Sequence, residues 1–245
     1  MKLYYILLSA VLLPSVCFSQ RAFKPGYVID LKGDTLRGFI EEHEWDNNPR
    51  VVSFKTHGTD NARKFTVADI DQFTVESAVT YKRHICRISL ATTDENHLYA
   101  KDTTTKLDTV FLEVLQAGKN ISLYAYADNV KTRYFVSEKD ATPQELIYMV
   151  YIKPSVQATD PVRTQTDNVF IQQLRSIALK YGRLDDDLQK QLDGLEYREH
   201  SVVDVASKIN GIDKPVLVKK KKSYLKLAFA LALFVFIGYQ VFGKL

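Results

Sequence analysis

Tyr27-Val28-Ile29-Asp30-Leu31, Lys32-Gly33-Asp34-Thr35 and Leu36-Arg37-Gly38-Phe39-Ile40 form the stretch that decides the fold class of this 245-residue chain. Apolar and polar residues alternate in the first and third parts, which is typical of half-buried strands. The Gly-Asp pair between them favours a tight turn, and Tyr27, Ile29 and Leu31 fall on one face. The stretch therefore predicts an antiparallel hairpin.

Runs with strand character continue from this hairpin to about residue 153. In chain order they are Val51–Lys55, Lys64–Val67, Gln72–Val75, Thr80–Leu90, Thr109–Leu115, Ser122–Ala127, Lys131–Val136 and Glu145–Ile152. The polar stretch Thr92–Lys106 has no periodicity and predicts a loop. We therefore expect a mainly β domain over residues 20–153, built as an antiparallel meander that is either barrel-like or a sandwich.

The hydrophobic period becomes helical after a linker predicted at residues 154–166. Phe170, Leu174, Ile177 and Tyr181 recur at helical spacing, and two similar but shorter patterns follow. The acids Asp185–Asp187 suit the start of the second helix, and Ser201 is a candidate cap for the third. Residues 167–211 therefore predict a short α-helical region.

A basic linker at residues 212–223 leads into an apolar segment, residues 224–242, which predicts one C-terminal transmembrane helix. At about 1.5 Å per residue the segment reaches across a hydrocarbon core of about 30 Å. A buried core helix is the alternative. The residues expected to anchor the chain in membrane lipid are Lys219, Lys220, Lys221, Lys222, Leu227, Phe229, Leu233 and Phe236.

The first 19 residues have the features of a secretory signal peptide. Lys2 is followed by an apolar run, and Cys17-Phe18-Ser19 offers small residues for cleavage before Gln20. An uncleaved anchor and a lipoprotein attached through Cys17 are the alternatives.

Together the two ends indicate a protein held in the inner membrane with its soluble domain in the periplasm. The positive-inside rule opposes this topology, because Lys219–Lys222 would lie outside the cytoplasm. Outer-membrane association and a cytoplasmic tail anchor remain as alternatives.

Charge and cysteine content exclude several classes of function. Lys219–Lys222 account for the whole net charge of +4, so the rest of the chain is close to neutral and no nucleic-acid partner is expected. Cys86 is the single cysteine after the signal, which excludes an internal disulfide and a cysteine-based zinc site.

No stretch of the chain has the spacing of a catalytic or cofactor-binding motif. His84-Ile85-Cys86 offers two ligands on one strand face, too few for a metal site. Gly33-Asp34-Thr35 is explained by the hairpin turn, and the other histidines are expected to be exposed. We therefore expect no catalytic residue, no cofactor and no bound metal.

Tyrosine is abundant, with 14 residues in the chain. Tyr124, Tyr126 and Tyr134 are candidates for an exposed aromatic face that contacts a partner. Packing of this face against the helices at 167–210 is the preferred interpretation, and an exposed face is the alternative.

The chain also resembles a group of uncharacterised exported envelope proteins of Bacteroidetes-type bacteria. The matching residues are Pro25–Asp30, Lys32–Ile40, Trp45, Asn48-Pro49, Val110–Leu115, Gly118-Lys119, Leu123-Tyr124, Tyr134-Phe135 and the signal ending in Ser19-Gln20. In that group a similar β domain often precedes an outer-membrane β-barrel, which this chain replaces with one apolar segment. The resemblance implies an envelope location and no activity.

These observations favour a non-enzymatic, membrane-anchored protein of the cell envelope that acts through protein interaction or as a structural module. Envelope proteins are its expected partners, and the sequence identifies no small-molecule ligand. A cytoplasmic tail-anchored adaptor and an envelope hydrolase with an unrecognised site are the alternatives.

Overall fold

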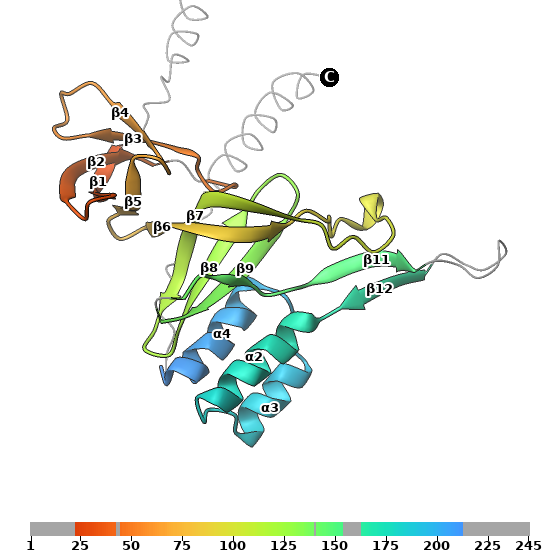
Figure 1. The fold of residues 1–245 in the computed structure, drawn as a ribbon. Coiled ribbons are helices and arrows are strands. Elements are labelled where there is room, and N and C mark those ends of the chain that lie inside the picture. Colours follow the sequence, from red (N-terminus) through yellow and green to blue (C-terminus); the bar gives the residue numbers. More distant parts are fainter. Residues whose placement is uncertain (1–22, 43–44, 140, 154–162, 213–245) are drawn as a thin grey trace, which may run out of the picture.

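The computed structural model describes residues 23–42, 45–139, 141–153 and 163–212 (Figure 1). They form a mainly β structure with three small helices, as expected from the sequence. The main sheet is antiparallel, with the order β10-β9-β8-β7-β6-β5-β1-β2-β3-β4. Its strands are β1 Phe23–Asp30, β2 Thr35–Glu41, β3 Val51–Lys55, β4 Arg63–Thr66, β5 Ile70–Val75, β6 Val79–Ser89, β7 Thr105–Ala117, β8 Ile121–Ala127, β9 Thr132–Glu138 and β10 Gln144–Glu145.

The predicted hairpin is confirmed as β1 and β2, with Val28 opposite Leu36. Asp30 closes its turn by accepting hydrogen bonds from the backbone N–H groups of Lys32 (2.8 Å) and Asp34 (2.9 Å). Gly33 has a φ of 93°, a conformation that glycine adopts without strain. Because β1 also pairs with β5, the sheet continues from this hairpin into β6.

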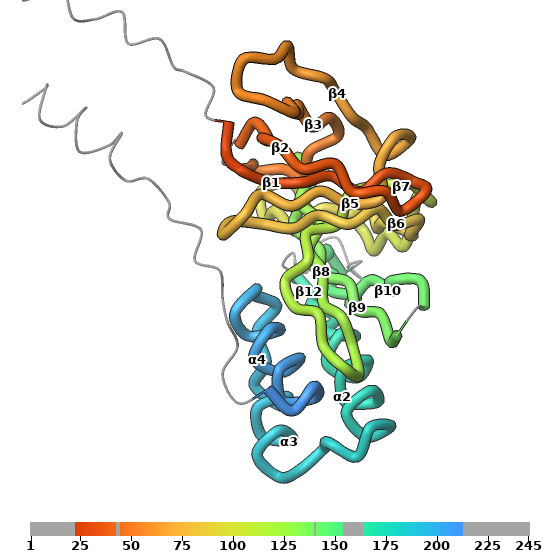
Figure 2. Tube along the Cα trace, turned by 90° about the vertical axis from the view of Figure 1, so that its left-hand side faces the viewer, coloured from red at the N-terminus to blue at the C-terminus, as the bar shows by residue number. Residues whose placement is uncertain are grey.

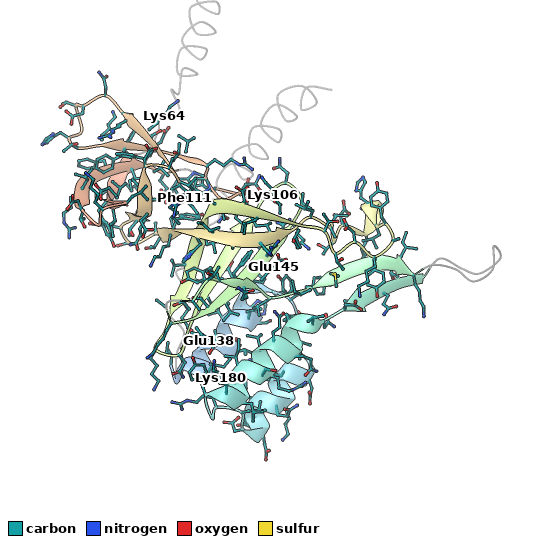
Figure 3. All side chains as sticks on the ribbon, in the orientation of Figure 1. Lys64, Lys106, Phe111, Glu138, Glu145 and Lys180 are labelled. Carbon is teal, nitrogen blue, oxygen red and sulfur yellow. The ribbon has the colours of Figure 1, made fainter. Side chains whose placement is uncertain are left out.

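The sheet bends into two halves that share the long strands β6 and β7. In the first half, β1–β5 enclose a core of aliphatic and aromatic side chains. Trp45 packs edge-on against Phe73 and Tyr81, with ring centroids 5.8 and 5.6 Å apart. Phe111 of β7 extends this core to the junction between the halves (Figure 3).

The second half, β6–β10, curls until its edge strand β10 returns to β6. The backbone N–H and Oγ of Ser89 donate to the Glu145 carboxylate at 2.8 and 2.5 Å. Arg133 Nε donates to the carbonyl of Ser89 at 2.9 Å. These bonds join the two margins of the curl.

Asn48, in the loop after β2, connects the two halves. Its Nδ2 donates to the carbonyls of Phe111 (2.7 Å) and Ala125 (3.1 Å). Its Oδ1 accepts from the N–H of Ala127, whose carbonyl in turn accepts from the N–H of Asn48, both at 2.9 Å. The loop is thereby fixed to β7 and β8.

Three helices pack together against β8 and β9 (Figures 1 and 2). They are α2 Val169–Lys180, α3 Asp186–Asp193 and α4 Glu199–Asn210. Asp185 caps α3 by accepting from the N–H of Leu188 at 2.7 Å. Glu138 of β9 and Lys180 of α2 form an ion pair at 2.5 Å where the sheet meets the helices (Figure 3).

Asn210, the last residue of α4, joins this helix to the turn between β7 and β8. Its Oδ1 accepts from the N–H groups of Asn120 (3.1 Å) and Ile121 (3.0 Å). Its Nδ2 donates to Gln116 Oε1 (2.9 Å) and the carbonyl of Ile121 (3.0 Å). Gly118 leaves room for this amide, because a Cβ at that position would overlap it.

Three sequence predictions about these elements are wrong. Glu145–Ile152 is not one strand, because β10 ends at Glu145 in the main sheet and Met149–Lys153 forms a strand, β11, of a separate two-stranded sheet. Ser201 does not cap α4, because the helix begins at Glu199 and its N-cap is Arg198. Part of the predicted linker 154–166 is a strand, β12 Arg163–Asp167, which pairs with β11 Met149–Lys153. Strand β11 supplies the backbone hydrogen bonds that hold β12 as a strand. The polar sequence of β12 does not predict this pairing by itself.

Among the described residues, no helix is long and apolar enough to cross a membrane. The predicted signal peptide, residues 1–19, and the predicted span, residues 224–242, lie outside the described residues.

Candidate functional site

A cleft of about 950 Å³ lies between the β5–β6 hairpin and α4. Its volume is within the range of ligand-binding pockets, about 300–1,000 Å³. Residues from five elements form it: Thr74 from β5, Thr80 from β6, Val114 and Leu115 from β7, Tyr124 from β8, and Glu199 and Val203 from α4.

The hairpin wall of this cleft presents a row of polar side chains. The hydroxyls of Thr74 and Thr80 are 3.0 Å apart and share a hydrogen bond. Gln72 Nε2 lies 3.4 Å from both Thr74 Oγ1 and the Tyr27 hydroxyl, to which it donates weakly. Such amide and hydroxyl groups both donate and accept, so the wall can hydrogen-bond a polar ligand.

The floor is aliphatic because of a bulge in β7. Val114 pairs with Tyr124 and Gln116 pairs with Leu123, so the register shifts at Leu115. The shift lets two consecutive residues, Val114 and Leu115, both line the cleft. Together with Val203 of α4 they give the cleft an apolar base.

The helix wall is held by an aromatic cluster behind it. The Tyr197 hydroxyl accepts from the N–H of Tyr134 (3.0 Å) and donates to the carbonyl of Leu146 (2.9 Å). Its ring stacks on Tyr148 with centroids 4.7 Å apart. The Tyr134 hydroxyl also forms a hydrogen bond with the backbone of Glu199. These contacts fix the N-terminal end of α4, and with it Glu199.

The lining of the cleft includes both acidic and basic residues. Glu113 of β7 and Glu199 of α4 line it, together with Lys82 and His200. The Tyr81 hydroxyl donates to Glu113 Oε2 at 3.4 Å. Burial raises the pKa of Tyr81, and the negative charges of Glu113 and Glu199 raise it further. Both carboxylates therefore lie near enough to the Tyr81 hydroxyl to raise its pKa.

The three tyrosines predicted as an exposed interaction face are buried. Tyr124, Tyr126 and Tyr134 are each 6% exposed. They also lie on two different faces of the sheet: Tyr134 packs under the helices, whereas Tyr124 and Tyr126 fill the core of the second half. The exposed face is therefore wrong, and packing against the helices is confirmed for Tyr134 but not for Tyr124 and Tyr126. The sheet curls and covers the side that faces away from the helices.

His84 and Cys86 lie on the inner side of the second half. Burial lowers the pKa of His84 to about 4 and raises that of Cys86 to about 12. The His84 ring packs edge-on against Tyr124, with centroids 4.9 Å apart. Within the described residues, no three His, Cys, Asp or Glu side chains are grouped to hold a metal ion.

The residues that make this cleft were not identified from the sequence. Glu113 belongs to a predicted strand, and Glu199 and His200 precede a predicted helix, so nothing local marks them as neighbours. Packing of α4 against β7 and β8 brings them together. The predicted anchoring residues, Lys219–Lys222, Leu227, Phe229, Leu233 and Phe236, lie outside the described residues.

The chain was also compared with known proteins. No protein-family model, no curated protein and no solved structure matches it.

Proposed function

We propose that this chain is a non-enzymatic, membrane-anchored protein of the cell envelope that acts through protein interaction. Its apolar segment at residues 224–242 anchors it in the inner membrane, and the β domain with its helices lies in the periplasm. Outer-membrane association and a cytoplasmic tail anchor are the competing locations.

The observation that carries the interaction role is the cleft between the β5–β6 hairpin and α4. It combines an aliphatic floor, a wall of hydroxyl and amide groups, and two carboxylates. This combination gives a binding site both affinity, from apolar burial, and orientation, from polar groups. We propose that envelope partners of this protein bind here.

Location is tested by adding protease to intact cells and to spheroplasts. The proposal expects the domain to be degraded in spheroplasts, and the mature protein to begin at Gln20. Protection until the inner membrane is broken, together with an intact Met1, would establish the cytoplasmic tail anchor instead.

Partner binding is tested with a photoreactive amino acid placed at Thr80, in the cleft, in living cells. Thr59, an exposed residue of the β3–β4 loop, is the matched control. We expect an adduct with a defined envelope protein from Thr80 and none from Thr59. The same adducts from both positions would show that partners do not bind specifically in the cleft.

A hydrolase is the second candidate, because Glu113 and Glu199 face one cleft. Two carboxylates that flank the scissile bond act as acid and base in glycoside hydrolysis. The test is turnover of chromogenic glycosides and esters by the full chain, with Glu113→Gln and Glu199→Gln as controls. The interaction function predicts no turnover, whereas turnover that both variants abolish would establish the enzyme.

A further inference from the structure

The two-stranded sheet of β11 and β12 has one strand edge that pairs with no other described strand. β12 pairs with β11 alone, from Met149 opposite Asp167 to Lys153 opposite Arg163. Figure 1 shows this ribbon projecting beyond the main sheet and the helices. An open strand edge presents unpaired N–H and C=O groups, which can pair with a strand of another chain.

The opposite edge of the ribbon is covered by the chain itself. The N–H of Ile152 in β11 donates to the carbonyl of Tyr99 at 2.8 Å. Lys101 Nζ donates to Asp167 Oδ2 at 2.7 Å and lies over the ring of Tyr151, 5.4 Å from its centroid. The ribbon is therefore held on its β11 side, and β12 is its outer strand.

The bond to Tyr99 also fixes the direction of the free backbone groups in β12. Because the N–H of Ile152 points away from β12, Ile152 and its partner Thr164 form a non-hydrogen-bonded pair. Such pairs alternate along an antiparallel ladder, so Val150 and Thr166 form the next one. The N–H and C=O groups of Thr164 and Thr166 therefore point toward the free edge.

The edges of the main sheet are protected against pairing in ways that β12 is not. β10 has only two residues, and β4 carries the charged side chains of Arg63 and Lys64. Short edge strands and charged residues are common protections of this kind. The centre of β12 is instead the uncharged run Thr164-Gln165-Thr166, whose three side chains are exposed. In the described part of the chain, β12 is thus the edge best suited to accept another strand.

The sequence of this edge is complementary to itself. When two copies of β12 lie antiparallel about Gln165, Thr164 of each copy faces Thr166 of the other. The outward N–H groups of both threonines then meet carbonyl groups of the second copy. Arg163 falls opposite Asp167 of the second copy, so no like charges face each other. We propose that β12 pairs with β12 of a second copy, which gives a dimer with two-fold symmetry.

This pairing uses no group that already has a partner. Asp167 keeps its hydrogen bonds from Lys101 and from the Tyr151 hydroxyl, because the new bonds come from the backbone alone. Few residues of each copy meet, so we expect a weak dimer that forms reversibly. The dimer does not involve the cleft, and it is therefore independent of the partner binding proposed above.

A cysteine at the two-fold axis tests the dimer. The full chain carries Cys17→Ser and Gln165→Cys and is purified in a neutral detergent; its native Cys86 is buried. In the proposed register the two copies of residue 165 form a non-hydrogen-bonded pair, with Cα atoms about 4.5 Å apart. That separation lies within the range of about 4.4–6.8 Å that a disulfide requires. We expect a disulfide-linked dimer on mild oxidation, measured by non-reducing electrophoresis.

Thr164→Cys is the matched control, because it is the adjacent residue and is also exposed. In the proposed register the two copies of residue 164 are diagonal neighbours about 7–8 Å apart, too far for a disulfide. We expect the linked dimer to form at least about tenfold faster in Gln165→Cys than in Thr164→Cys. Equal rates, or a faster reaction of Thr164→Cys, would overturn the proposal.

The backbone bonds are tested by two substitutions of Thr166 in the Gln165→Cys chain. Thr166→Pro removes an N–H that points to the free edge and leaves the bonds to β11, which come from the neighbouring residues. Because the symmetric dimer loses two hydrogen bonds, we expect the cross-link to slow about tenfold or more. Thr166→Ala keeps the N–H and should slow it only about two- to threefold. Equal rates in the two variants would show that strand pairing does not join the copies.

Discussion

The two halves of the main sheet fill their interiors with different chemistry. In the first half, Phe73 is fully buried and packs against Trp45, Tyr81 and Phe111. In the second half the largest fully buried side chain is that of Arg133. It donates to Asp128 Oδ1 and to the carbonyl of Ser89, both at 2.9 Å.

The difference shows how one sheet can be held by two kinds of interaction. Aromatic packing depends on the volume and shape of side chains, and it tolerates changes of pH. A buried charge depends on every hydrogen bond around it, because an unpaired charge in a protein interior is costly. We therefore expect the two halves to respond differently to mutation and to acid.

Phe73→Ala should have the largest effect and weaken the first half. Removing this buried ring leaves a cavity among three aromatic partners. We expect a loss of about 3–5 kcal/mol in the free energy of unfolding. Urea denaturation followed by the fluorescence of Trp45, the single tryptophan, measures it. Leu31→Ala, at a 52% exposed position, is the control and should change little.

Arg133→Met should weaken the second half almost as strongly. The variant removes the arginine donor to the carbonyl of Ser89 and one of the three donors to Asp128 Oδ1, the other two being the N–H groups of Val130 and Lys131. Because Asp128 is 30% exposed, water compensates in part, and we expect a loss of about 2–4 kcal/mol.

The control for Arg133→Met is Arg37→Met, which removes an exposed ion pair with Glu76. It should cost about 1 kcal/mol or less. Similar losses in the two variants, measured by urea denaturation followed by circular dichroism, would contradict the distinction between a buried and an exposed arginine.

Asn48→Ala should uncouple the unfolding of the two halves. Its side chain makes three hydrogen bonds to β7 and β8, and about 1–3 kcal/mol should be lost with them. Trp45 fluorescence reports on the first half, whereas circular dichroism reports on the whole sheet, so the two transitions should diverge. In Asn47→Ala, which removes one exposed bond to Asn129, they should coincide.

His84→Phe should have the smallest effect and change only the response to acid. Burial lowers the pKa of His84 from 6.5 to about 4, so the unfolded chain binds this proton more readily. Stability from this group is therefore present above about pH 6.5 and is lost as the pH falls toward 4. His84→Phe should flatten the dependence of the urea midpoint on pH in that window. A flattening of equal size in His57→Gln would exclude His84 as its source.

Much of the fold follows from local sequence patterns, but the cleft does not. Alternation around Lys32–Thr35 predicts the first hairpin, and the period of Phe170, Leu174 and Ile177 predicts α2. The curl of the sheet depends on contacts between distant residues, such as Ser89 with Glu145, which no local pattern encodes.

The error over the tyrosines has the same cause. Alternation in Ser122–Ala127 correctly separates the two faces of β8, and Ile121, Leu123 and Ala125 do pack under the helices. It does not indicate that the other face is covered by β6 and β7. Glu113 and Glu199 are brought to one cleft by the same long-range packing, so the sequence alone does not identify them.

The bonds of Asn210 also determine how the domain carries mechanical load. Its side-chain amide bonds both the N–H and the carbonyl of Ile121, as the backbone of a neighbouring strand would. A pull applied at Ile212 would therefore pass from α4 into the start of β8 and stretch several hydrogen bonds at once. The domain would resist such a force as a unit, because α4 cannot peel away until this one amide has released the sheet.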